Sequence, residues 1–145
     1  MKAREIIRKT LKIGYTAGEM HEAIVRALEA EGYVSTPSDD RGSQYRDLMN
    51  ALGDNERSGF SVDMHATGNN SAGGVTAGPS IAPWRKDRAH LKVQQNHIFA
   101  FEFNINTWVP EWGMRLSINF EEDSIITEKG IEALCPWHDE IILIR

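Results

Sequence analysis

The stretch FAFEFNI, residues 99–105, alternates between large apolar residues and small or polar ones along its whole length. Successive side chains of a β-strand point to opposite faces of a sheet, so this period of two predicts a strand with one buried face. The buried face would carry Phe99, Phe101, Phe103 and Ile105. Glu102 falls on the other face, in the middle of the most aromatic run of the chain. It either faces water or holds a ligand.

Two more segments repeat this alternation and predict two further strands. In residues 60–65 the polar positions are Ser61, Asp63 and His65. In residues 114–121 they are Arg115, Ser117, Asn119 and Glu121. The turn sequence VPEWG, residues 109–113, precedes the last of these strands and predicts an antiparallel hairpin with the strand at 99–105. Short strands are also expected at 125–126, before a turn at 128–130, and at 141–144.

The first third of the chain predicts helices. Thr16 and Glu19 form a capping box, in which each side chain accepts a backbone N–H of the other residue. The helix that starts there places Met20, Ile24 and Leu28 on one face and is expected to end near Gly32. A shorter helix around Ile6, Ile7 and Leu11 is expected before Gly14, and a third around Tyr45, Leu48, Met49 and Leu52. Helices followed by strands indicate an α+β fold.

Composition limits the classes of protein that fit. A chain of 145 residues is expected to form a single domain, residues 1–145, with 41% hydrophobic and 26% charged residues. No apolar run reaches the roughly 20 residues of a membrane-spanning helix, and the first residues lack a secretory signal, so a cytoplasmic protein without membrane contact is expected. The net charge of −5, with scattered bases, argues against a nucleic-acid partner.

The polar faces of the three strands carry one histidine and two carboxylates, His65, Glu102 and Glu121. One interpretation is that this face is simply solvated, as one side of an antiparallel sheet commonly is. A second is that the acids pair with Arg115 or Lys92. A third is a divalent-metal site, because a cation would compensate carboxylates that otherwise repel one another. Spacing alone does not decide between them.

The other candidate residues have simpler interpretations. The glycine-rich segment 67–79 lacks the Gly-Lys-Ser/Thr sequence of a phosphate-binding loop, and Ser71 lacks the glycines of a nucleophile elbow. The single cysteine, Cys135, excludes an internal disulfide and is expected to be a small buried hydrophobe. The remaining histidines, expected at the surface, are His21, His90, His97 and His138.

The order of the segments resembles the pita-bread metallopeptidases, which include methionine aminopeptidases, Xaa-Pro aminopeptidases, prolidases and creatinase. The resemblance rests on the sequences HATG at 65–68, AGPSI at 77–81, FEF at 101–103, VPEW at 109–112, FEED at 120–123 and ITEKG at 126–130. It extends upstream to the capped helix at Thr16. The implied fold is a curved antiparallel sheet backed by the N-terminal helices, with a dinuclear metal centre on its concave face.

The resemblance also implies roles for individual residues. His65 corresponds to the family's metal-binding histidine, Glu102 to its first glutamate ligand and Glu121 to its bridging glutamate. Glu121 is preferred to Glu122 because it lies six residues before Thr127 and shares the polar face of the strand. Glu102 and His65 are therefore the expected catalytic residues. The expected cofactor is Mn, Co or Zn, and the expected activity is hydrolysis of an N-terminal peptide bond of the Xaa-Pro type.

Two departures from the family pattern qualify these expectations. The family's two aspartate ligands lie on a hairpin upstream of the histidine, and Asp39, Asp40 and Asp63 are in the wrong places to replace them. The second histidine of the glycine-rich loop also has no counterpart between Asn69 and Ala77. The chain therefore resembles the C-terminal part of a catalytic domain, a fragment that would bind at most one ion, weakly, and hydrolyse peptides poorly or not at all.

Two alternatives follow from these departures. The chain could be a non-catalytic pita-bread module that binds peptides or proteins. It could also be part of an assembled enzyme, in which a homodimer partner or a complementing N-terminal half supplies the missing residues, since an incomplete sheet exposes apolar surface.

Overall fold

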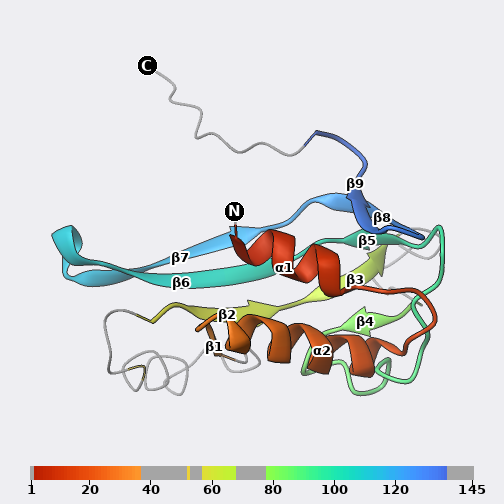
Figure 1. Ribbon diagram of the computed structural model, residues 1–145, viewed down its shortest axis with the longest axis horizontal. Coiled ribbons are helices and arrows are strands. Elements are labelled where there is room, and N and C mark those ends of the chain that lie inside the picture. The colour runs from red at the N-terminus through yellow and green to blue at the C-terminus, as the bar shows by residue number, and fades with distance from the viewer. Residues whose placement is uncertain (1, 37–51, 53–56, 68–77, 137–145) are drawn as a thin grey trace.

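The computed structural model describes residues 2–36, 52, 57–67 and 78–136, which form two helices and nine strands (Figure 1). The helices are α1 (Lys2–Thr10) and α2 (Ala17–Ala30). The strands are β1 (Val34–Ser35), β2 (Gly59–Val62), β3 (Met64–Thr67), β4 (Ser80–Ile81), β5 (Ile98–Ala100), β6 (Phe103–Val109), β7 (Met114–Phe120), β8 (Asp123–Thr127) and β9 (Gly130–Ala133). This arrangement confirms the α+β class predicted from the sequence.

The capping box predicted at the start of α2 is present. The Glu19 backbone N–H donates to Thr16 Oγ1 at 3.3 Å, and the Thr16 backbone N–H donates to Glu19 Oε2 at 2.8 Å. At the other end, Gly32 has φ +90°, a conformation that favours glycine after a helix. The helix α2 therefore has the predicted limits, and its predicted stripe of Met20, Ile24 and Leu28 is buried.

The strands form two sheets. One has four strands in the order β1-β2-β6-β7 and the other has five in the order β4-β3-β5-β8-β9. All neighbouring strands are antiparallel except β1 and β2. The predicted hairpin is β6-β7, joined by the short helix η1 (Pro110–Trp112) and by Gly113 at φ +59°. The predicted turn before Gly130 joins β8 to β9.

Two of the three alternating segments, 60–65 and 99–105, are each broken into two strands, which corrects the prediction that they are continuous, whereas the predicted strand 114–121 is the continuous strand β7 and the strand predicted at 125–126 is β8. The breaks fall at Asp63, at residues 101–102 and at residues 121–122, so that β2 is followed by β3, β5 by β6, and β7 by β8 (Figure 1). Backbone bonds keep the broken segments side by side, because Asp63 N–H donates to the Glu102 carbonyl and Phe101 N–H donates to the Glu122 carbonyl. The three breaks therefore lie in one row, where the chain passes from one sheet to the other.

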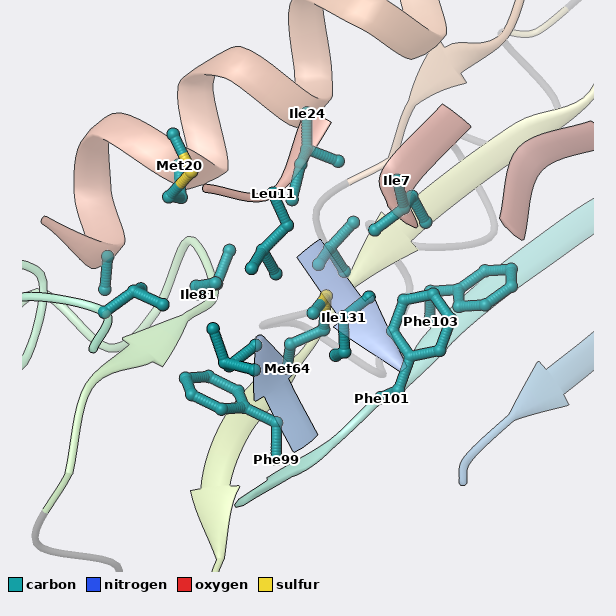
Figure 2. Packing of buried hydrophobic residues seen from close by; sticks show 14 of the residues in the cluster. Ile7, Leu11, Met20, Ile24, Met64, Ile81, Phe99, Phe101, Phe103 and Ile131 are labelled. Atoms are coloured by element: carbon teal, nitrogen blue, oxygen red, sulfur yellow. The ribbon is translucent and has the colours of Figure 1, made fainter. Parts of the chain in front are cut away.

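The helices and the sheets meet in one hydrophobic core (Figure 2). Ile7 and Leu11 from the α1 region and Ile24 from α2 are at most 1% exposed, as are Phe99 and Phe101 of the aromatic run. Phe101 and Phe103 lie with ring centroids 5.5 Å apart, and Phe103 stacks on Phe120 at 4.9 Å. The apolar face predicted for the aromatic run is thus largely the core face, and of the residues between its members Glu102 and Asn104 are half-buried while Ala100 is buried.

Two predictions of half-buried strands need correction. In β2 all four residues are buried, including Ser61 at 8% exposure, because β2 lies inside the sheet between β1 and β6. In β7, by contrast, Met114 is 56% exposed and Ile118 is 37% exposed, although both belong to the predicted apolar face. The edge position of β7 leaves these two residues exposed, while Leu116 and Phe120 of the same face are half-buried.

Cys135 is exposed, which corrects the prediction of a buried thiol. The sheet ladder ends where Leu134 N–H donates to the Asp123 carbonyl, so Cys135 follows the last paired residue. Neither helix of the described residues has the length and apolar character needed to cross a membrane. The predicted third helix, apart from the buried Leu52, the glycine-rich residues 68–77, His138 and the predicted strand at 141–144 lie outside the described residues.

Candidate metal centre

The three residues singled out from the sequence come together at the row of strand breaks. His65 belongs to β3, Glu102 lies in the break between β5 and β6, and Glu121 lies in the break between β7 and β8. Each offers one ligand atom, and these three atoms all lie within 4.8 Å of one another. The adjacent Glu122 does not belong to this cluster.

The local sequence explains why these side chains share one face. Glu102 lies between Phe101 and Phe103, which are both buried in the core, so its side chain leaves on the opposite side. His65 lies between the buried Met64 and Ala66 and is placed in the same way. Glu121 follows Phe120, which stacks on Phe103. The aromatic residues of the core thereby orient the polar residues of the cluster.

The cluster is partly shielded from solvent. The side chains of His65 and Glu102 are 25% and 29% exposed, and His65 Nε2 lies 3.8 Å from Glu102 Oε2. That distance is too long for a hydrogen bond. His65 Nδ1 is buried and has no hydrogen-bond partner among the described residues. A buried polar atom without a partner is costly. Because no described residue forms a hydrogen bond with Nδ1 that could orient the ring, packing holds this imidazole in place.

The donor set fits a divalent transition metal. Imidazole and carboxylate ligands suit Zn, Co and Mn. Ligand atoms bound to one ion at about 2.0–2.2 Å can lie at most about 4.4 Å apart. The separations of up to 4.8 Å therefore require only small side-chain rotations to bring all three atoms onto one ion.

The structure gives little support to the alternative that Glu121 forms an ion pair with Arg115 or Lys92. Glu121 is exposed and forms no ion pair with any described residue. Arg115 donates to the carbonyl oxygens of Arg57 and Asn106, and it lies six residues before Glu121, about 20 Å away along an extended strand. Lys92 lies near Glu19 of the α2 cap, where it helps to lower the pKa of that carboxyl.

The other described histidines take no part in the cluster. His90 is exposed, as predicted, whereas His21 and His97 are half-buried, and burial lowers the pKa of both. The ring of His97 lies 6.2 Å from that of Phe99, and its Nδ1 accepts the Gln94 N–H. The partial burial of His21 and His97 differs from the predicted surface positions, because it depends on residues that are distant in the sequence.

A group of side-chain amides, not predicted from the sequence, lies beside the cluster. Asn104 and Asn119 are paired across β6 and β7, two residues from Glu102 and Glu121 respectively. Their amides are hydrogen-bonded to each other. The alternation of apolar and polar residues could have revealed these amides, since it places Asn104 and Asn119 on the same face as the two glutamates.

Comparison with solved structures supports the predicted fold. The chain is similar to the X-Pro aminopeptidase of Thermotoga maritima MSB8, with a TM-score of 0.54 and 21% identity over 99% of this chain and 31% of that one. It is also similar to the prolidase of Pyrococcus horikoshii OT3, with a TM-score of 0.52 and 16% identity over 97% of this chain and 30% of that one. No protein-family model and no curated protein matches the chain.

These similarities define the class of fold. The described residues have the mixed α+β arrangement of antiparallel sheets and helices found in pita-bread aminopeptidases. The chain spans about a third of the length of the two solved structures. At this identity the comparison establishes the fold, and the activity of the chain is a matter for proposal.

Proposed function

We propose that the chain is a metal-dependent peptidase domain of the Xaa-Pro aminopeptidase type, with His65, Glu102 and Glu121 as its metal ligands. The observation that carries this proposal is the convergence of the three side chains, from three separate segments, within 4.8 Å. The similarity of the fold to an X-Pro aminopeptidase and a prolidase gives it further support. The chemistry of the donors favours one Mn, Co or Zn ion for this set of ligands.

A divalent ion bound to these residues would act as a Lewis acid that lowers the pKa of water and polarises a peptide carbonyl. His65 and Glu121 would hold the ion, and their neighbours Met64, Ala66 and Phe120 fix the direction of their side chains. Glu102 would be both a ligand and the general acid and base. It would accept a proton from the attacking water and return it to the leaving amine.

The partial burial of Glu102 suits this second role. Its side chain is 29% exposed and lies beside the His65 imidazole, so substrate can reach it while packing holds it in position. A free carboxylate oxygen within hydrogen-bond reach of the water is the geometric requirement for proton transfer. A carboxyl group has two oxygens, so one can serve as the ligand and the other as the proton acceptor.

A second candidate function is a non-catalytic module that binds peptides or a partner protein. The exposed apolar residues of the β6-β7 hairpin, among them Trp112, Met114 and Ile118, favour some association. A homodimer or a complementing chain would cover them, and the same association could bring further ligands to the exposed Glu121 in an assembled enzyme. These partners, like the cytoplasmic location expected from the sequence, remain predictions.

Isothermal titration with Mn and Zn tests the metal centre directly. We expect one weak site in the wild-type chain, and loss of that site in His65→Ala and Glu121→Gln. Glu122→Gln is the matched control, because it removes the neighbouring carboxylate outside the cluster and should leave binding unchanged. Absence of binding in the wild-type chain would refute the metal centre, and two tight sites would refute the single ion.

A peptidase assay then separates the two candidate functions. Hydrolysis of an Xaa-Pro peptide that requires added metal and is lost in Glu102→Gln supports the enzyme. Binding of a peptide or partner that is unaffected by metal and by Glu102→Gln supports the module instead. Unfolding of each variant by urea, measured without metal, shows whether the substitution has merely disturbed the fold.

A further inference from the structure

A row of amide side chains lies beside the candidate metal centre, on the same face of the four-stranded sheet. Asn104 of β6 lies two residues after Glu102, and Asn119 of β7 lies two residues before Glu121. The two asparagines are direct cross-strand partners. The core-facing residue Phe103 lies between Glu102 and Asn104, so these two polar side chains leave the sheet on the side opposite the core.

The hydrogen bonds of this row have a defined direction. Asn106 Nδ2 donates to Asn104 Oδ1 at 2.7 Å. Asn104 Nδ2 in turn donates to Ser117 Oγ at 2.8 Å and to Asn119 Oδ1. A carboxamide has two N–H donors and one carbonyl acceptor, so the Asn104 side chain uses both donors and its oxygen within the row.

The direction of these bonds fixes the Asn119 side chain. Because Asn104 can only donate to it, Asn119 must turn its oxygen toward Asn104 and its NH2 group away. No described residue accepts a hydrogen bond from Asn119 Nδ2, and Asn119 is exposed. The sheet therefore presents two oriented N–H donors beside the carboxylate of Glu121.

We propose that Asn119 donates a hydrogen bond to a backbone carbonyl oxygen of the bound peptide and that Asn104 is the positioning residue that orients it. This inference rests on the proposed function. Two residues along a strand span about 6.6 Å, which is also the length of two residues of extended peptide. A peptide whose scissile carbonyl lies at the ligand cluster therefore has the carbonyl of the residue two positions away within reach of Asn119. A neutral amide can bind that oxygen without changing the charge of the metal centre.

Side-chain amide NMR of the full chain tests this inference. The Asn119 NH2 signals are assigned by their loss in Asn119→Asp, and the chain is titrated first with Zn and then with the tetrapeptide Ala-Pro-Ala-Ala, which has a backbone carbonyl two residues after the scissile one. We expect the Asn119 signals to shift when the peptide is added and the peptide affinity of Asn119→Ala to fall about five- to tenfold, as for one lost hydrogen bond. Zinc affinity, measured by calorimetry, should change by less than about twofold.

Two further variants separate recognition from a structural role. Ser117→Ala removes another partner of Asn104 and leaves Asn119 in place, so peptide affinity should stay at the wild-type value. Asn104→Asp replaces the donor with a carboxylate, which should draw the Asn119 NH2 toward position 104 and weaken the peptide as much as Asn119→Ala does.

The outcomes distinguish this inference from the function on which it rests. Zinc binding together with unchanged Asn119 signals and unchanged peptide affinity in Asn119→Ala would overturn the role of Asn119 alone. Equal losses of zinc and peptide affinity in Asn119→Ala would also overturn it, because they indicate support of the ligands rather than contact with the peptide. Absence of zinc binding in the wild-type chain would overturn the metal centre itself.

Discussion

The five-stranded sheet and strand β7 of the four-stranded sheet are built from the same alternating sequence pattern, yet they differ sharply in burial. In the five-stranded sheet, Phe99 of β5 and Ile126 of β8 are fully buried. In β7, by contrast, Ile118 is 37% exposed and Met114 is 56% exposed, and Leu116 and Phe120 are half-buried. A period of two therefore identifies the face of a strand, whereas the elements packed on that face decide whether it is buried.

The helices account for the difference. Residues of α1 and α2 join the cluster that contains Phe99 and Ile131, and the Arg8 carbonyl approaches Gly130 closely at the start of β9. The β6-β7 hairpin extends beyond the helices (Figure 1). The candidate metal centre lies at the junction of the two regions. The half covered by the helices thus supplies His65, and the segment that begins at Glu102 and ends at Glu121 contains the β6-β7 hairpin.

The largest effect expected from this contrast is on core packing. Phe99→Ala removes a fully buried aromatic ring and should lower the free energy of unfolding by about 3–5 kcal/mol. Ile118→Ala, on the exposed hairpin, should lower it by less than about 1 kcal/mol. Urea unfolding followed by circular dichroism measures both. Equal losses would mean that the hairpin face is covered in solution, for example by a second copy of the chain.

A smaller difference in stability is expected when two glycines with positive φ are each replaced by alanine. Gly130, at φ +114°, would place a Cβ 2.9 Å from the Arg8 carbonyl oxygen, whereas Gly113, at φ +59°, has no atom within 4 Å of that position. Gly130→Ala should therefore lower the free energy of unfolding by about 2–3 kcal/mol, through both backbone strain and collision with α1. Gly113→Ala should lower it by about 1 kcal/mol through strain alone. The same urea titration provides the comparison, and an equal loss in both variants would contradict the close packing of α1 on β9.

The sequence was sufficient for features that depend on neighbouring residues. The capping box of Thr16 and Glu19, the hairpin around residues 109–113 and the faces of His65, Glu102 and Glu121 follow from local spacing, and the structure shows each of these arrangements. The breaks in the strands did not follow from it, because the alternation continues unchanged through residues 101–102. A strand can keep its side-chain alternation while it exchanges hydrogen-bond partners, and only the neighbouring strands determine where that exchange occurs.

The features that depend on distant residues were predicted less well. The exposure of Cys135 and the burial of Ser61 depend on what lies beside them in the sheet. The amide row of Asn104, Asn119 and Ser117 depends on the register between β6 and β7, which the turn sequence alone did not specify. The proximity of His65, Glu102 and Glu121 was expected from resemblance together with alternation, whereas their neighbours Asn104 and Asn119 became visible only through cross-strand pairing.

Metal binding is expected to have a smaller effect on the free energy of unfolding, and the proposed ligands come from both regions. An ion that binds only the folded chain stabilises it by about 1.4 kcal/mol at a metal concentration ten times the dissociation constant. We expect Zn at this concentration to raise the free energy of unfolding of the wild-type chain by this amount, which a higher urea midpoint reports, and EDTA to reverse the change. Glu121→Gln should abolish the response, and Glu122→Gln should retain it. A response in the wild-type chain that persists in Glu121→Gln would show that the ion binds elsewhere.

The smallest effect is expected at the α2 cap, within the covered region. Hydrogen bonds from Thr16 lower the pKa of Glu19 below its ordinary value of 4.5. A carboxyl whose pKa is lower in the folded state stabilises the fold above its ordinary pKa, and this contribution is lost as the pH falls through the lowered value. The stability difference between the wild-type chain and Glu19→Gln should therefore be constant near neutral pH and shrink below about pH 4.5. Urea midpoints measured between pH 3 and pH 7 test this, and in a Thr16→Ala background the Glu19→Gln substitution should have little effect at any pH, because the partner that lowers the pKa is gone.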